Sequence, residues 1–346
     1  MKELNILITG GAGFIGSNAA EYFLKKGNNV KIIDNLSRRG SSDNLSILRK
    51  EYPKIKFVKA DIRKDTKILE KEAKSSDCII HLAAQTAVTD SIKDPRCDFE
   101  SNALGTFNVL EAARKSEKNP KVLFSSTNKV YGQIKDIPTR EINKKYFYEG
   151  ISSIGEDRIL DFHSPYGCSK GCADQYVRDY NRIYGLPTTV FRQSCIYGPR
   201  QFGIEDQGWV AWFAIASMLG KKITIYGDGK QVRDVLFVND LVRAYELALS
   251  SRKTSGEIYN IGGGEKNTLS LFELIEILEK IISKKISCDF GPWRAGDQKV
   301  YISRITKAER DFAWKPSVAP EEGVGIMCKW ISKNLPAIKK SLEAKK

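Results

Sequence analysis

The chain has 346 residues, of which 41% are hydrophobic and 28% charged, a balance typical of soluble globular proteins. Its formal net charge is +14, but lysines and arginines are dispersed among acids, so we interpret the excess as a solvated surface rather than a nucleic-acid-binding tract. The opening MKELNILITG lacks the apolar run of a signal peptide, and the longest apolar stretch, 209–219, is too short to span a bilayer. We therefore expect a cytoplasmic protein that binds neither membranes nor nucleic acid.

Short apolar runs alternate with helix-like stretches over the first two-thirds of the chain. We predict strands at residues 6–9, 30–34, 55–58, 78–82, 122–126 and 188–191. We predict helices between them at residues 14–26, 102–115 and 166–184. Strands that alternate with helices are typical of βαβ units, so the pattern predicts an α/β protein with a doubly wound parallel sheet, the Rossmann fold.

The rhythm becomes irregular after Phe191, although helices are still expected near 240–250 and 269–282. We expect a smaller C-terminal lobe that folds over the carboxyl edge of the sheet and binds the substrate. The predicted domain boundaries are 1–191 plus 234–260 for the dinucleotide-binding domain and 192–233 plus 261–346 for the substrate lobe.

Seven cysteines are scattered along the chain. Their odd number and the lack of CxxC pairs argue against a disulfide framework or a zinc ribbon. Cys168 and Cys172 could face each other on a helix, but two thiols alone make a poor metal site. We expect reduced thiols and no metal.

A glycine-rich turn follows the first predicted strand and precedes the first predicted helix. It reads Gly10-Gly11-Ala12-Gly13-Phe14-Ile15-Gly16, which contains G-x-G-x-x-G and also fits G-x-x-G-x-x-G. Glycines there permit a tight turn and let the backbone approach a pyrophosphate, whose charge the helix N-terminus stabilises. Because the turn lies between a strand and a helix at the start of a βαβ unit, it predicts a dinucleotide site.

Asp34 ends the second predicted strand, where a carboxylate would accept hydrogen bonds from the adenosine ribose and repel a 2′-phosphate. This favours NAD over NADP, although the nearby Arg38 and Arg39 weaken the preference, since arginine can bind a 2′-phosphate. Further ligand-facing loops are expected after the third strand, at Asp61-Ile62, and after the fourth, at 81–84. The expected cofactor contacts are Gly10, Gly13, Phe14, Ile15, Gly16, Asp34, Asn35, Ser37, Arg38, Asp61, Ile62, Leu82, Ala83, Ala84, Asn102, Tyr166 and Lys170.

Tyr166 and Lys170 have Y-x-x-x-K spacing at a predicted helix start, so their side chains share one helix face. An ammonium beside a phenol favours the phenolate. Free tyrosine titrates near pH ~10, so a base that works near neutrality needs a shift of roughly 3 units, about 4 kcal/mol. Lys170 and a positively charged nicotinamide ring could share that task. Of the two histidines, we interpret His81 as a structural residue at a strand end, whereas His163 could touch substrate; neither is assigned a catalytic role.

Eight segments in succession resemble the extended short-chain dehydrogenases that modify nucleotide sugars. They are LITGGAGFIGSN, DNL, HLAAQ, SSTNKVYG, SPYGCSKG, YGPRQ, GKQVRDVLFVNDL and YNIGGG. The resemblance covers nearly the whole chain. The resemblance implies bound NAD, a nucleotide-sugar substrate, and a homodimer or homotetramer paired through helices 102–115 and 166–184. It also implies that Tyr166 deprotonates a sugar hydroxyl, that Lys170 holds the nicotinamide ribose, and that Thr127 hydrogen-bonds the same hydroxyl.

The family contains epimerases, 4,6-dehydratases, decarboxylases and reductases. Its dehydratases carry Asp-Glu directly after the active-site threonine to expel water, whereas this chain has Asn128-Lys129, neither of which is a carboxylic acid. The segments LDFHSPYGCSKG, ADQYVRDY, RQFGIEDQGWVAWF and GDGKQVRDV resemble instead the CDP-paratose 2-epimerases, which form CDP-tyvelose by inverting C2 of a 3,6-dideoxyhexose. A UDP-hexose 4-epimerase is the alternative. A non-catalytic NAD-binding module is a third interpretation, against which the presence of Thr127, Tyr166 and Lys170 argues.

The resemblance further implies that Arg233 and Arg294 contact the substrate diphosphate and that Asp297 contacts the nucleotide ribose. An arginine fork suits phosphate because it donates two hydrogen bonds. Cys195 departs from the family, in which many relatives have Asn at this position, and DQGWVAWF could equally be a buried helix of core aromatics. The expected substrate contacts are Gln85, Asn128, Lys129, Gln193, Cys195, Gln201, Gln207, Trp209, Tyr226, Arg233, Arg294 and Asp297.

Overall fold

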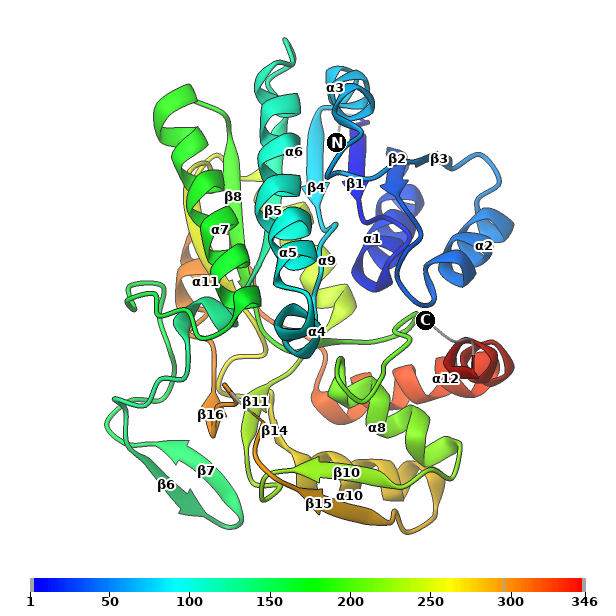
Figure 1. Ribbon diagram of the computed structural model, residues 1–346, viewed down its shortest axis with the longest axis vertical. Coiled ribbons are helices and arrows are strands. Elements are labelled where there is room, and N and C mark those ends of the chain that lie inside the picture. Colours follow the sequence, from blue (N-terminus) through cyan, green and yellow to red (C-terminus); the bar gives the residue numbers. More distant parts are fainter. Residues whose placement is uncertain (1–2, 295, 344–346) are drawn as a thin grey trace.

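A seven-stranded parallel sheet forms the centre of the larger part of the molecule in the computed structural model, which describes residues 3–294 and 296–343 (Figure 1). In pairing order the strands are β13 (Glu257–Ile261), β8 (Thr188–Gln193), β5 (Lys121–Thr127), β4 (Cys78–His81), β1 (Asn5–Thr9), β2 (Asn29–Asp34) and β3 (Lys56–Lys59). Every neighbouring pair is parallel. The strand order reverses beside β1, as in a doubly wound dinucleotide fold, so the predicted fold class is confirmed.

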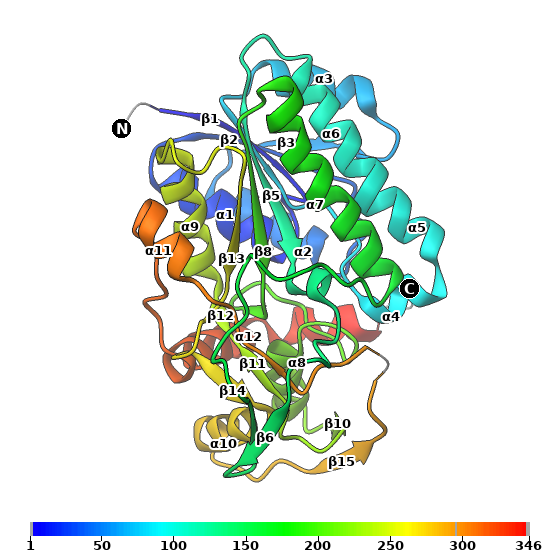
Figure 2. The same cartoon turned by 90° about the vertical axis from the view of Figure 1, so that its left-hand side faces the viewer.

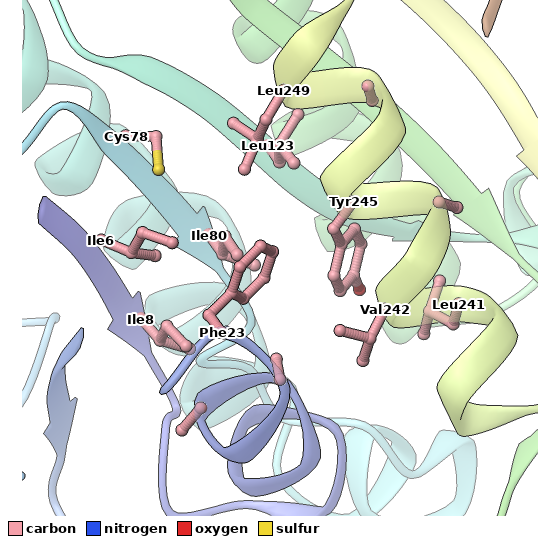
Figure 3. Close-up of a cluster of buried hydrophobic side chains, with 14 of the residues drawn as sticks. Ile6, Ile8, Phe23, Cys78, Ile80, Leu123, Leu241, Val242, Tyr245 and Leu249 are labelled. Atoms are coloured by element: carbon pink, nitrogen blue, oxygen red, sulfur yellow. The ribbon is translucent and has the colours of Figure 1, made fainter. Parts of the chain in front are cut away.

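Helices cover both faces of this sheet, because alternate residues of each strand point to opposite sides. Ile6 and Ile8 of β1 pack in one buried cluster with α1 (Phe14–Lys25), α2 (Ser41–Glu51) and α9 (Val238–Ser250) (Figure 3). Leu7, between them, packs on the other face. The helices there are α3 (Thr66–Lys74), α6 (Gly105–Arg114) and α7 (Pro165–Tyr184). Figure 2 shows α1 and α9 on one side of the sheet and α6 and α7 on the other.

The segment before α6 differs from the expected single helix at 102–115. Two short helices, α4 (Val88–Lys93) and α5 (Pro95–Phe99), lead into a π-helical turn, η1 (Glu100–Leu104), and α6 follows directly. An apolar periodicity of 3.6 residues does not reveal a turn with one extra residue, so the helix was expected without it. The remaining predicted strands and helices of the sheet are present, with ends that shift by at most two residues.

The smaller part of the molecule lies below the large sheet in the view of Figure 1. Its strand pairs are β10 (Ile223–Tyr226) with β15 (Cys288–Gly291), β11 (Val232–Asp234) with β14 (Thr268–Ser270) and β16 (Val300–Tyr301), β9 (Ile196–Tyr197) with β12 (Leu236–Phe237), and the hairpin β6 (Thr139–Ile142) with β7 (Lys145–Tyr148). Its helices α8 (Trp209–Met218), α10 (Leu271–Ile282) and α12 (Pro320–Glu343) share a separate buried cluster. α8 therefore contributes aromatic residues to a core, as the alternative interpretation of DQGWVAWF proposed.

The chain crosses between the two parts more than once. After the segment that contains α8, β13 returns to pair with β8 at the edge of the large sheet. α11 (Thr306–Phe312) also packs in the cluster of α1 and α9. The domain boundaries given above stay a prediction. None of the helices in residues 3–294 and 296–343 is long and apolar enough to cross a membrane, and the seven cysteines are free thiols.

Candidate active site

A cavity of about 470 Å³ lies at the carboxyl ends of β1, β2 and β4. Its lining includes the glycine turn and Asp34, and also Tyr166 and Lys170, so one cavity joins the expected cofactor residues to the expected catalytic pair. Sixteen of the seventeen expected cofactor contacts line it. They are Gly10, Gly13, Phe14, Ile15, Gly16, Asp34, Asn35, Ser37, Arg38, Asp61, Ile62, Leu82, Ala83, Ala84, Tyr166 and Lys170.

The glycine turn requires its glycines because backbone lies against backbone there. Gly10 has φ +69°, and a Cβ on it would lie 2.7 Å from the amide nitrogen of Ala83 in the loop after β4. A Cβ on Gly16 would lie 2.2 Å from the carbonyl oxygen of Gly10. Gly13 is the N-cap of α1, so the N-terminus of that helix lies beside the cavity. This arrangement suits the diphosphate of a dinucleotide.

Asp34 is held in place by the backbone. One carboxylate oxygen accepts a hydrogen bond from the Ala12 amide at 3.1 Å and the other from the Leu36 amide at 2.7 Å. Burial raises the pKa of Asp34, although these amides oppose the shift. Each carboxylate oxygen can accept a further hydrogen bond, which suits a ribose diol. The residues present therefore fit the adenosine end of NAD.

Tyr166 and Lys170 lie one turn apart at the start of α7. The helix begins there because Ser164 accepts a hydrogen bond from the Gly167 amide at 3.0 Å and Pro165 occupies the first helical position. Thr127 ends β5 and lies close enough to the phenol of Tyr166 to lower its pKa. The structure thus brings the three expected catalytic residues together; their roles stay a prediction.

The expected lowering of the Tyr166 pKa by Lys170 is wrong for the chain's own residues. Burial raises the pKa of Tyr166 to about 12, against the lowering effects of Thr127 and Arg38. Burial also lowers the pKa of Lys170 to about 7. The Lys170 ammonium donates to the carbonyl oxygen of Ser125 at 2.5 Å and lies over the ring of Phe124. Loss of water therefore dominates the pKa of both residues.

Asn102 is the one expected cofactor contact that does not line the cavity. It lies fully buried in the π-helical turn η1, and its amide nitrogen donates to Asp98 and Ser169, both at 3.0 Å. Its side-chain oxygen accepts from the Gln85 amide at 2.9 Å. Asn102 therefore ties the loop after β4 to the first turns of α7, which carry the catalytic pair.

A buried ion pair that could not be expected from the sequence connects α7 to the sheet. Both oxygens of Asp174 accept from the Arg192 guanidinium at 2.9 Å, and Asp174 also accepts from the Ser126 hydroxyl at 2.7 Å. Arg192 further donates to the Tyr131 hydroxyl at 3.0 Å. The pair connects α7 to β8 and to the strand that ends in Thr127. In the sequence, the feature that points to this pair is Arg192, a charged residue inside the otherwise apolar strand TTVFRQ.

Three of the expected substrate contacts line the cavity: Gln85, Gln201 and Gln207. Gln207 accepts a hydrogen bond from Arg38 and donates to the Thr86 hydroxyl at 2.6 Å. The segment before α8 thus bridges the cavity to the loops after β2 and β4. Gln193 does not line the cavity. Its side-chain amide donates to the Tyr245 hydroxyl at 2.8 Å and accepts from the Ser125 hydroxyl at 3.1 Å.

A second group of expected substrate contacts surrounds Cys195. Arg233 donates to Asp297 at 2.5 Å, and both Arg233 and Lys129 lie close enough to Cys195 to lower the pKa of its thiol, although burial raises that pKa overall. Trp209, at the start of α8, contacts the same thiol. Asn128 accepts from the Thr127 hydroxyl at 3.4 Å, which connects the catalytic trio to this group.

Arg294 and Tyr226 form a third group. The Arg294 guanidinium lies 4.0 Å from the centre of the Tyr226 ring and pairs with Asp206 at 3.2 Å. The Tyr226 hydroxyl donates to Glu205 at 3.0 Å. These contacts fasten the turn between Gln201 and Gln207.

The two histidines differ. His81 is buried, with Thr9 at 2.6 Å from one ring nitrogen and Thr106 at 3.0 Å from the other, and burial lowers its pKa to about 3. Its interpretation as a structural residue is confirmed. His163 pairs with Asp161 at 2.7 Å and is absent from the cavity lining.

The family model of GDP-mannose 4,6-dehydratase matches residues 7–327. The chain belongs to this family. Membership confirms the resemblance to the extended short-chain dehydrogenases. A curated relative, the CDP-paratose 2-epimerase of Salmonella typhi, is 44% identical over 337 residues, which cover 95% of this chain and 99% of the relative.

Two solved structures of the family share the whole fold. The UDP-glucose 4-epimerase of Thermotoga maritima, solved with UDP-glucose, has a TM-score of 0.83 at 32% identity and covers 96% of this chain and 100% of its own. A double mutant of the dTDP-glucose 4,6-dehydratase DesIV from Streptomyces venezuelae, solved with NAD bound, has a TM-score of 0.84 at 30% identity and covers 99% and 100%.

Proposed function

We propose that this protein is an NAD-dependent nucleotide-sugar epimerase that converts CDP-paratose to CDP-tyvelose by transient oxidation at C2. The observation that carries the proposal is the 44% identity to the Salmonella CDP-paratose 2-epimerase over 95% of the chain. The grouping of Thr127, Tyr166 and Lys170 beside one cavity supports an enzyme rather than a passive binding module. The experiment that tests it is incubation with a panel of CDP- and UDP-sugars, with products identified by NMR.

Four residues of the chain would bind the cofactor and handle the proton of the sugar hydroxyl. Asp34 would hold the adenosine ribose of NAD, and Lys170 the ribose next to the nicotinamide. When bound, NAD supplies the redox chemistry, since it accepts the hydrogen from the reacting carbon and later returns it. Tyr166 would exchange a proton with the sugar oxygen, and Thr127, which lies beside Tyr166, would hydrogen-bond and orient that oxygen.

The residues after Thr127 argue against a 4,6-dehydratase. Expulsion of water requires an acid that protonates the leaving hydroxyl, and the positions after Thr127 hold an amide, Asn128, and an amine, Lys129. A UDP-hexose 4-epimerase is the second candidate, favoured by the likeness to the Thermotoga structure. The same catalytic trio could act at C4, so only the product separates the two.

NAD is expected to copurify with the protein, because a redox-neutral epimerase must retain the reduced cofactor until the hydrogen returns. Denatured protein should release NAD rather than NADP, since the buried Asp34 carboxylate would repel a 2′-phosphate. Chromatography of the released nucleotide checks this. Release of NADP alone, or a need for stoichiometric NADPH during turnover, would contradict both the cofactor and the epimerase proposals.

We also propose a homodimer formed through α6 and α7, as in the family. Figures 1 and 2 show these helices side by side on the outside of the sheet. Their outer faces carry large side chains that are unusually exposed for apolar and aromatic residues, including Phe107 at 40%, Tyr176 at 48% and Ile183 at 66%. Such a surface suits association with a second copy. The tetramer remains an alternative, and the cytoplasmic location stays a prediction.

A further inference from the structure

Lys129 is a cation with few partners, placed beside the catalytic threonine. It lies in a short 3-10 helix, η2 (Asn128–Tyr131), and its backbone amide donates to the Thr127 hydroxyl at 3.2 Å. Its ammonium has a distant neutral acceptor, the side-chain oxygen of Gln298 at 3.4 Å. Gln298 is almost fully buried and its amide nitrogen donates to the Gly132 carbonyl, so its oxygen must face Lys129.

The charges around Lys129 do not balance. The groups that act on it are Arg233, Asp297 and Cys195. Asp297 is already paired with Arg233 at 2.5 Å, and burial raises the pKa of the Cys195 thiol, which leaves it neutral. Asp234 is turned away, since its oxygens accept hydrogen bonds from Ser194, Ser303 and Gly264.

Two cations thus face one carboxylate in this cluster. Burial and the neighbouring Arg233 both lower the pKa of Lys129. A partly buried ammonium that lacks an anionic partner is costly, and an incoming anion relieves the cost. The side chain of Asp297 retains 22% of its exposure and that of Arg233 10%, so the cluster is open to solvent on one side.

We propose that Lys129 binds the phosphate attached to C1 of the sugar and thereby holds C2 at the catalytic residues. This inference rests on the proposed function and names the residue that selects the reacting carbon. In a nucleoside diphosphohexose, C2 is bonded to the carbon that carries the phosphate, whereas C4 lies across the ring. An anion site whose backbone touches Thr127 brings the phosphate end of the sugar close to the catalytic hydroxyls, which suits C2.

The test compares two ligands that differ by this phosphate. CDP carries the distal phosphate that would bear the sugar, and CMP lacks it. Lys129→Met is expected to weaken CDP binding at least about tenfold in calorimetry and to leave CMP binding unchanged, because one charge-assisted hydrogen bond is lost. Lys129→Arg should keep most of the preference for CDP, since it keeps the charge.

Lys299→Met is the matched control for loss of one positive charge. Lys299 is exposed in the same part of the molecule and lies 5.0 Å from the Tyr146 ring centre. Its replacement should leave both affinities unchanged. Equal weakening of CDP and CMP in Lys129→Met, or no change in either, would overturn the assignment. CMP binding also reports that the variant is folded.

The proposed reaction and the role of Lys129 can fail separately. If wild-type protein inverts C4 of a UDP-hexose and not C2 of CDP-paratose, the proposed function fails, and with it the selection of C2. The phosphate contact would still be measured, with UDP and UMP as the pair of probes. If C2 inversion is observed but Lys129→Met keeps the full preference for CDP, only the role of Lys129 fails.

Discussion

Tyr166→Phe should lower turnover at least about 100-fold, the usual scale for loss of a general acid–base group. The ring remains, so its buried packing and the binding of the nucleotide sugar should change little. The hydroxyl that is lost is the one whose pKa Thr127 lowers. Turnover and ligand affinity should be measured on the same preparation, so that a drop in rate is not mistaken for loss of binding.

Tyr176→Phe is the control, because Tyr176 lies on the same helix and its side chain is exposed. It should retain wild-type turnover. A folded Tyr166→Phe variant with near-normal turnover would show that the proton is carried by another group.

Asp174→Ala should lower the free energy of unfolding by about 3–5 kcal/mol, because it leaves the Arg192 guanidinium buried without a counter-charge. Asp174 is fully buried and accepts two hydrogen bonds from Arg192 and one from Ser126. Urea denaturation monitored by circular dichroism measures the change.

Asp179→Ala, on the exposed side of the same helix, should stay within about 0.5 kcal/mol of wild type. Adding Arg192→Leu to Asp174→Ala should recover part of the loss, since the unpaired charge is then removed. If Asp174→Ala and Asp179→Ala unfold at the same urea concentration, the buried pair does not stabilise α7.

Local patterns predicted the sheet and the cofactor end of the cavity well. The strands of a doubly wound sheet are short, apolar and followed by ligand-facing loops, so the glycine turn, Asp34 and the loops at Asp61 and Leu82 could be placed on one edge from the sequence. The hairpin β6–β7 could not be predicted from the sequence, because most of β6, including Arg140 and Glu141, is exposed and the short β7 does not alternate in polarity.

Contacts between distant segments could not be read from the sequence. The ion pair of Asp174 and Arg192 joins residues 18 positions apart on different elements. The bridge from Arg38 to Gln207 joins residues 169 positions apart. Neither pair produces a periodic pattern in the sequence, because periodicity reports local structure and not contacts between distant segments. The effect of burial on the pKa of Tyr166 could not be predicted for a related reason, because spacing shows which charges are neighbours but not how much water they lose.

The most direct measurement of the proposed activity is the conversion of CDP-paratose in deuterium oxide, followed by NMR. The expected product is CDP-tyvelose without deuterium at C2, because the hydrogen removed from C2 is the one returned and Tyr166 exchanges a proton only with oxygen. Deuterium at C2 would indicate removal of a proton from carbon and would contradict the redox mechanism. No reaction of CDP-paratose, together with rapid C4 inversion of a UDP-hexose, would contradict the proposed substrate.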